Sequence, residues 1–336
     1  MRFRGSVAID LGTVNTLVWV AGRGIVLEEP TAIAIDTGVG KVAAVGEAAD
    51  ALADKEPQDI EVIHPLRDGV IADLDATAAM LHAFLRRTRR FGVLRRDALV
   101  CVPSGATPVE RRSIVAALSV RRPRYNVRLI DEPVAAAAGA GFDLTGGAGG
   151  FVVDIGGGTT EVAVISMSGT VYCNSVRIAG DEMDEAIIQH IRKHYRLLVG
   201  ERRAEEIKIA LGSAHPEALE RSSIEVKGRD LVDGVPKTLV ITDEEIREAL
   251  REPVMTIVET VRTCLERTPP ELAADIIEKG VVLTGGGALL RGLDLLLRQE
   301  TDLPITVGDD PLSCVALGTG KVLDELNLLK KVAIPA

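Results

Sequence analysis

The sequence has few cysteines and no long apolar run. Four cysteines occur among 336 residues, and no two of them form a CxxC pair. Cys101, Cys173 and Cys314 stand in apolar runs, so we expect buried, reduced thiols instead of disulfides or a metal site. No apolar stretch reaches the ~20 residues that span a bilayer, and a predicted strand follows Gly5 directly, which predicts no signal peptide. We therefore expect a cytoplasmic protein whose contact with any membrane is peripheral.

The chain also lacks an excess of basic residues and the commonest nucleotide-binding loops. Its net charge of −10 argues against general nucleic-acid binding. There is no GxxxxGK[ST] loop, because the segment 318–321 lacks the first glycine and the final Ser or Thr. No GxGxxG stands between a strand and a helix. The length of 336 residues predicts about two domains. Any bound phosphate would be held by hairpins and acids and not by one lysine-containing loop.

One short pattern occurs twice. In each copy a β-branched strand ends in an aspartate, a glycine-bearing turn follows, and a second apolar strand returns. Asp10 and Gly12 of the first copy correspond to Asp154 and Gly156 of the second, 144 residues further along the chain. A separation of about one domain length indicates one copy in each domain.

The repeated turns favour a nucleotide site. Glycine lets backbone N–H groups approach phosphate oxygens without a β-carbon in the way, and Asp10 and Asp154 can hold a hydrated Mg²⁺ through water. One glycine turn alone is more often an ordinary hairpin, but two matched copies and a third glycine turn at 285–287 reverse that preference. We expect the two hairpins to face each other and clamp a nucleoside triphosphate with its metal.

Strands and helices alternate in both halves of the chain, which predicts an α/β protein of two layered domains. Apolar patterns and turn residues predict strands at 6–11, 15–20, 31–35, 42–45, 98–102, 127–131, 152–155, 162–165, 222–228, 237–241 and 280–284. The same analysis predicts helices at 73–88, 107–118, 133–138, 181–197, 203–211, 243–266 and 271–278, one ending near 299, and one at 315–330. Thr242 and Glu245 form a predicted capping box, and the small residues at 146–150 are the candidate hinge.

The chain resembles a known superfamily of ATPases. Five segments resemble those of the actin, Hsp70 and sugar-kinase ATPase superfamily: 10–16, 131–139, 154–161, 205–213 and 284–292. Within it the chain is similar, over essentially its whole length, to the MreB/Mbl family of bacterial actin homologues. The longer segments that carry this closer resemblance are 28–30, 68–73, 101–105, 154–164, 200–202, 204–209, 283–290 and 310–318.

The resemblance implies an actin-like (ribonuclease H-like) fold of two duplicated domains, with a central nucleotide cleft and a smaller subdomain on each. The first domain then comprises residues 1–140 and 312–336, with its subdomain at about 31–66. The second comprises residues 141–311, with its subdomain at about 177–240.

The resemblance also implies an ATP and Mg²⁺ site and a role for individual positions. The phosphate turns match Gly12, Thr13, Val14, Asn15, Gly156, Gly157 and Gly158. The ribose and base positions match Glu205, Lys208, Gly285, Gly286 and Gly287. Asp10 and Asp154 match the Mg²⁺-associated acids, and Asp154 belongs with the catalytic group as well. Glu132 matches the acid that orients the attacking water, with Thr159 as its helper across the cleft.

Glu132 has two interpretations from the residues alone. Phosphoryl transfer to water requires mainly positioning, charge neutralisation and one water-orienting carboxylate. An acid directly before Pro133 at a helix start is equally favoured by the helix dipole without any catalytic role. Asp131 beside it stands where the family usually has Glu, and 121–126 replaces a segment that is usually small. These departures leave the phosphate segments intact.

A basic segment at 86–96 surrounds three apolar residues, Phe91, Val93 and Leu94, with six arginines. This composition is typical of interfacial membrane anchors, but it also fits a solvated basic loop with the apolar trio packed beneath it. The resemblance favours membrane contact, because the family has a hydrophobic loop at this place.

The implied function is a slow ATPase, coupled to polymerisation, that forms membrane-associated filaments and directs cell-wall synthesis and cell shape. Its implied partners are further copies of itself, the inner face of the cytoplasmic membrane and cell-wall synthesis proteins, with no nucleic acid. Two alternatives share the nucleotide turns: the ATPase domain of an Hsp70-type chaperone and a small-molecule kinase.

Overall fold

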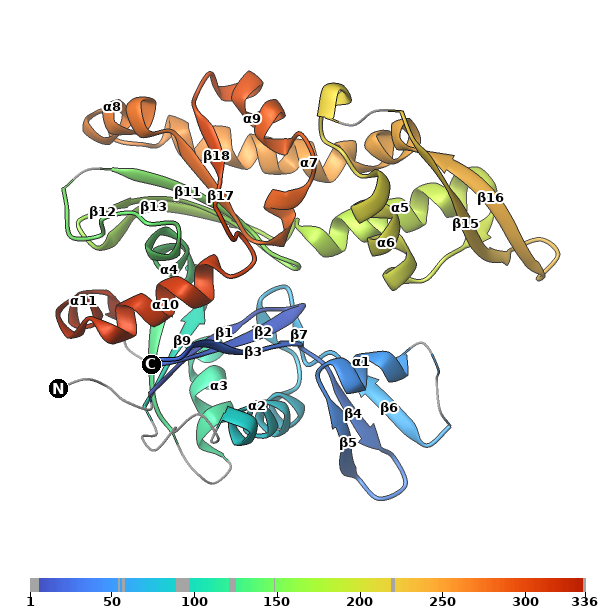
Figure 1. Ribbon diagram of the computed structural model, residues 1–336, viewed down its shortest axis with the longest axis horizontal. Helices are drawn as coiled ribbons and strands as arrows, with labels where there is room; N and C mark the ends of the chain where they lie inside the picture. The colour runs from blue at the N-terminus through green and yellow to red at the C-terminus, as the bar shows by residue number, and fades with distance from the viewer. Residues whose placement is uncertain are drawn as a thin grey trace.

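The computed structural model describes residues 6–53, 55, 58–88, 97–120, 125–147, 149–218 and 221–334. Two large sheets lie one above the other in Figure 1, with helices α4 and α10 between them. The order of strands is β19-β10-β9-β1-β2-β3 in the six-stranded sheet and β13-β12-β11-β17-β18 in the five-stranded sheet. The actin-like α/β fold implied by the sequence is confirmed.

The six-stranded sheet contains the first copy of the repeated pattern. Its strands are β1 (Val7–Leu11), β2 (Asn15–Val20), β3 (Gly24–Pro30), β9 (Asp97–Val102), β10 (Asn126–Asp131) and β19 (Ala333–Ile334). Val7 and Ile9 pack under α2 (Leu74–Thr88) and α3 (Pro108–Ser119), whereas Ala8 packs toward the helices between the sheets. This division follows from the alternation of side chains along a strand.

The five-stranded sheet contains the second copy. Its strands are β11 (Gly150–Ile155), β12 (Thr160–Ser166), β13 (Gly169–Val176), β17 (Val281–Thr284) and β18 (Ile305–Val307). Its outer face is covered by α5 (Gly180–Tyr195), α7 (Asp243–Glu266) and α9 (Leu293–Thr301), and α8 (Pro270–Lys279) precedes β17. Val152 and Ala163 point the other way, into the core shared with the six-stranded sheet.

Two small sheets extend from the large ones, on the right of Figure 1. One contains β4 (Ile33–Asp36), β5 (Lys41–Val45) and β6 (Ile60–Ile63), beside α1 (Glu47–Ala53). The other contains β14 (Leu197–Leu198), β15 (Ser223–Asp230) and β16 (Pro236–Thr242), near α6 (Glu201–Leu211). A short hairpin, β7 (Leu66–Arg67) with β8 (Val70–Ile71), precedes α2.

The helices between the sheets, α4 (Glu132–Gly139) and α10 (Cys314–Asp324), cross at very short distance. A β-carbon on Gly139 would lie 1.8 Å from the carbonyl oxygen of Cys314, and one on Gly318 would lie 1.8 Å from that of Ala135. Only glycine permits this approach at both positions. Because both sheets pack against this pair, the crossing joins the two halves of the molecule.

Several elements differ from the sequence-based expectation. Strands β3 and β13 were not predicted, because each lies toward the rim of its sheet with a half-buried pattern of weak apolar alternation. The helix predicted at 315–330 is two helices, α10 and α11 (Leu326–Val332), separated at the extended residue Glu325. No Gly or Pro marks the break, and apolar side chains on both sides enter the same core.

The membrane-related predictions meet the structure only in part. Across the described residues, no helix combines the length and the apolar character needed to cross a bilayer. Phe91, Val93 and Leu94, the predicted membrane-contacting side chains, lie outside the described residues.

Candidate functional site

The turns of the two hairpins have the same backbone hydrogen bond and lie against each other. The N–H of Gly12 donates to the carbonyl oxygen of Asn15 at 3.0 Å, and the N–H of Gly156 donates to that of Thr159 at 2.9 Å. A β-carbon on Gly157 would lie 2.2 Å from Cγ2 of Val14, so the second turn packs directly on the first. The predicted facing arrangement of the hairpins is present.

A cavity of about 550 Å³ opens beside these turns, within the size range of ligand pockets. Most of the predicted site residues line it: Asp10, Gly12, Thr13, Val14, Asn15, Glu132, Asp154, Gly156, Gly157, Glu205, Lys208, Gly285, Gly286 and Gly287. The two exceptions are Gly158 and Thr159. A β-carbon on Gly158 would meet Thr13 at 2.9 Å, and Thr159 lies against Gly69, so both residues are in the seam between the halves.

Three acids meet at the inner end of the cavity. Asp10 and Asp154 are buried at the ends of β1 and β11, and Glu132 begins α4 between the sheets. Burial, together with the charge of Asp154, raises the pKa of Asp10 to about 7. Burial also raises the pKa of Glu132 well above its ordinary value, with the charges of Glu161, Asp154 and Asp10 adding to the effect. The Thr284 hydroxyl donates to Oδ1 of Asp154 at 2.7 Å and orients that carboxyl.

The two aspartates fit a hydrated Mg²⁺. No cluster of three or more side chains able to hold a metal occurs among the described residues. Mg²⁺ in nucleotide sites, however, is usually held by one or two carboxylates, with phosphate oxygens and water completing the octahedron. Burial raises the pKa of Asp10 to about 7 and that of Asp154 to about 6, and a divalent ion between the two carboxyls would favour their charged forms.

The outer end of the cavity combines a charged pair with an apolar rim. Nζ of Lys208 donates to Oδ2 of Asp184 at 2.6 Å and to the carbonyl oxygen of Gly180 at 3.0 Å, which joins α6 to the start of α5. Ile209 and Leu289 line the same cavity and remain 66% and 55% exposed. Large apolar side chains exposed beside a glycine turn form a slot suited to a flat, apolar ring face.

Sequence reasoning did not identify several lining residues, among them Asp184, Asp181, Glu28 and Leu312. Asp181 and Asp184 lie in the first two turns of α5, where acids are common near helix N-termini for electrostatic reasons alone. Lys208 could have pointed to Asp184, because a largely buried lysine requires an acidic partner.

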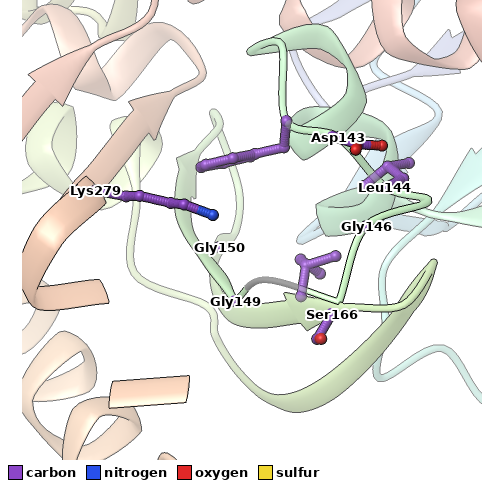
Figure 2. Close-up of a pocket in the computed structure, with 9 residues that line it drawn as sticks. Asp143, Leu144, Gly146, Gly149, Gly150, Ser166 and Lys279 are labelled. Atoms are coloured by element: carbon purple, nitrogen blue, oxygen red, sulfur yellow. The ribbon is translucent and has the colours of Figure 1, made fainter. Parts of the chain in front are cut away.

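A smaller cavity of about 140 Å³ lies at the other end of β11. Figure 2 shows Lys279 reaching toward it from the end of α8, opposite the loop that carries Asp143 and Leu144. This cavity is below the size of nucleotide sites. The glycines around it are packed, because a β-carbon on Gly149 would lie 3.2 Å from Leu272. The hinge role of 146–150 stays a prediction.

The fold and the cleft define an actin-like protein with a cavity between its two halves. The chain matches the crystal structure of Spiroplasma citri MreB5 bound to ADP with a TM-score of 0.90 and 35% identity, covering 98% of both chains. The TM-score, identity and coverage are the same for the structure of that protein bound to AMPPNP. The MamK double helical filament, at a TM-score of 0.77 and 20% identity, supports the fold alone.

The sequence comparisons define the family within this class. The MreB/Mbl protein family profile matches residues 4–331. The chain is 51% identical to the cell shape-determining protein MreB of Escherichia coli over 337 aligned positions, covering 97% of this chain and 96% of the relative. It is 46% identical to the cell shape-determining protein Mbl of Bacillus subtilis over 330 positions, covering 98% of each. The chain therefore belongs to the MreB/Mbl family, and the chaperone and small-molecule kinase alternatives are not favoured.

Proposed function

We propose that this protein is an ATP-hydrolysing, actin-like cytoskeletal protein that polymerises on the inner face of the cytoplasmic membrane and directs cell-wall synthesis to set cell shape. The observation that carries the proposal is the pair of matched hairpins, whose aspartates Asp10 and Asp154 face one cavity between two sheets. The relatives named as cell shape-determining proteins support the biological role.

The nucleotide would lie along the cavity with its phosphates at the inner end. Backbone N–H groups of 13–15 and of 157–158 would donate to phosphate oxygens, because those of Gly12 and Gly156 close the turns. Asp10 and Asp154 would hold Mg²⁺ through water, and the ion, when bound, neutralises charge on the phosphates. At the outer end, Glu205 and Lys208 would contact the ribose, and the base would lie on the turn at 285–287 beside the apolar rim.

Hydrolysis would depend on Glu132 and the residues beside it. Glu132 is half-buried between the sheets next to Asp154 and lines the cavity, so its carboxyl can accept a hydrogen bond from one water and hold it in line with the terminal phosphate. Thr159 would assist from the seam across the cleft. The raised pKa of Glu132 implies that it becomes an efficient acceptor only once a cation lowers the local negative potential.

Polymerisation would follow from the same cleft. In the proposed division, residues 1–140 with 312–336 form one domain and residues 141–311 the other, with small subdomains at about 31–66 and 177–240. A nucleotide held by both domains would bias their relative rotation. Contacts between the opposite ends of successive copies, which do not close into a ring, would then produce a filament.

Sedimentation with and without nucleotide tests this function. We expect the purified protein to pellet with ATP and Mg²⁺, to release phosphate slowly, and to show no stimulation by sugars. Soluble protein whose turnover depends on a sugar would contradict the proposal. Glu132→Ala should retain ATP binding and slow phosphate release by about 100-fold, the usual contribution of a positioned acid or base; unchanged release would remove Glu132 from this role.

Membrane binding has its own test. Replacing Phe91, Val93 and Leu94 by Ser should abolish co-flotation with anionic liposomes, because it removes the apolar side chains that would insert below the lipid headgroups. Replacing Arg95 and Arg96 by Gln is the matched control for charge. Flotation that survives the triple serine substitution would place the anchor elsewhere.

A further inference from the structure

A buried acid lies next to the proposed catalytic residues without a role in the proposed function. Glu161 on β12 is 1% exposed, in a strand that continues as the apolar run Val162 to Ile165. It is directly opposite Asp154 on β11 and opposite Ser175 on β13. Directly opposite residues of antiparallel strands project from the same face of the sheet. Glu161 therefore shares with Asp154 the face that is turned toward α4 and the six-stranded sheet.

Glu161 accepts hydrogen bonds from the other half of the molecule. Both the N–H and the hydroxyl of Ser104 donate to its Oε1, at 3.0 and 3.2 Å. Ser104 lies in the turn that follows β9, a central strand of the six-stranded sheet. The same hydroxyl is 2.9 Å from Sγ of Cys173 on β13. One serine of the first half is thus fixed on two neighbouring strands of the second half.

This arrangement is costly for stability. Oε2 of Glu161 is buried and has no hydrogen-bond partner. Leaving a buried polar group unpaired is unfavourable, and the corresponding position of the first hairpin, opposite Asp10, is the apolar Leu17. An apolar residue is therefore compatible with this backbone position. The geometry of Glu161 indicates a function in the contact between the halves.

We propose that Glu161 is a positioning residue for nucleotide hydrolysis: its contact with Ser104 holds the two halves in the closed arrangement in which Glu132 faces Asp154. This inference rests on the proposed ATPase function. Glu132 begins α4 directly after β10, which pairs with β9, the strand that precedes Ser104. Ser104 and Glu132 therefore move with the same sheet. A contact that fixes Ser104 on β12 also fixes Glu132 beside β11.

The ion pair between Arg177 and Asp68 across the seam is weaker than the Ser104 contact. Arg177 and Asp68 approach to 3.8 Å, but the arginine side chain is 64% exposed, so solvent screens this pair. The Ser104 contact is partly buried and uses a backbone N–H, which cannot rotate away. After burial, the charge of Glu161 contributes most to the raised pKa of Glu132.

Amide hydrogen exchange measures this contact directly, because the Ser104 N–H is one of the donors and Pro103 before it has no N–H. In the full-length protein with Mg²⁺, we expect AMPPNP to slow exchange at Ser104 at least tenfold relative to the nucleotide-free state. Glu161→Gln keeps an acceptor oxygen and should keep the protection. Glu161→Ala should lose it, and Arg177→Ala, which removes the exposed pair across the same seam, should keep it.

Turnover distinguishes positioning from a merely structural role. We expect Glu161→Ala to lower kcat at least tenfold with KM for ATP within threefold, and Glu161→Gln to stay within threefold of the wild type in both. Wild-type kcat in Glu161→Ala, or equal impairment of the Gln and Ala variants, would overturn the proposal. If Glu161→Ala does not fold, Ser104→Ala removes one donor from the opposite side and should lower kcat with KM unchanged; a wild-type kcat there would overturn it. If the wild type binds AMPPNP but hydrolyses no ATP, the proposed function fails, whereas the exchange measurement still tests the contact.

Discussion

Replacing Gly318 by Ala tests whether the crossing of α4 and α10 holds the two halves together. A β-carbon at position 318 would lie 1.8 Å from the carbonyl oxygen of Ala135 and 2.5 Å from the backbone nitrogen of Gly139. Both atoms belong to the α4 backbone, so no side chain can rotate to make room. Ordinary contacts begin near 3.4 Å, so the helices would have to separate by about 1.5 Å at this point.

The expected cost exceeds the intrinsic gain from alanine. In a helix, Gly to Ala favours folding by about 1 kcal/mol. Inserting a methyl group into a packed core costs about 1–3 kcal/mol when side chains can adjust, and here the backbone itself must move and break contacts on both sheets. We therefore expect a net destabilisation of about 3 kcal/mol.

Urea unfolding followed by Trp19 fluorescence measures this effect. Trp19 is the single tryptophan of the chain, is buried, and packs on α10 beside Gly320, so its emission reports on the crossing. Gly105→Ala is the matched control, because a β-carbon there has no neighbour within 4 Å. Surface substitutions typically change the free energy of unfolding by no more than about 0.5 kcal/mol. If the free energies of unfolding of Gly318→Ala and of this control differ by no more than that, the tight crossing does not carry the stability assigned to it.

Three further predictions concern the acids, a helix cap and the phosphate turn. The pKa of Asp10 is raised in the folded state to about 7, so the folded protein binds the extra proton and the nucleotide-free, metal-free protein should lose on the order of 3 kcal/mol of stability as the pH rises from 4 to 7. Urea titrations should show this loss, and Asp10→Asn should reduce its slope without abolishing it, because burial also raises the pKa of Asp154 to about 6; an unchanged slope in that variant would contradict the assignment. Thr242→Ala removes the capping box of α7 and should cost about 1 kcal/mol by the same assay, whereas Thr238→Ala on the exposed part of β16 should cost less. Gly157→Val would force the second turn off Val14 and should weaken ATP binding at least tenfold by fluorescent-nucleotide titration, with Gly105→Val as the neutral control.

The sequence predicted the central strands and long helices best, because their apolar patterns are strong. β1 and β2 agree with the predicted strands at 6–11 and 15–20 to within one residue, and α7 agrees with its predicted helix at 243–266. The capping box at Thr242 is confirmed by both of its hydrogen bonds. Elements near the rims, such as β3, α1 and β18, were not predicted because they are short or half-exposed, and tertiary packing determines such elements more than local pattern.

The candidate site was predictable where chemistry is carried by local motifs. The two hairpins and the turn at 285–287 could be read from glycine and aspartate spacing, and the structure brings them to one cavity. Ser104 and Glu161 could not, because each looks locally ordinary: Ser104 follows a proline at a strand end, and Glu161 is a single acid in a strand. The two residues are 57 positions apart in the sequence and meet only because the two sheets pack together, which no local pattern encodes.

The two hairpins have the same backbone hydrogen bond in their turns but differ in the side chain that lies opposite the aspartate. Their turns make the same hydrogen bond, and in both the aspartate lies opposite the residue seven positions later. That residue is Leu17 in the first copy, where it forms part of the cavity wall, and Glu161 in the second, where it contacts the other half. A leucine can only shape the cavity, whereas a carboxylate can accept hydrogen bonds from a moving partner. In the proposed function the symmetric backbone would bind the phosphates, and the asymmetry at this single position would tie closure of the halves to the copy beside Glu132.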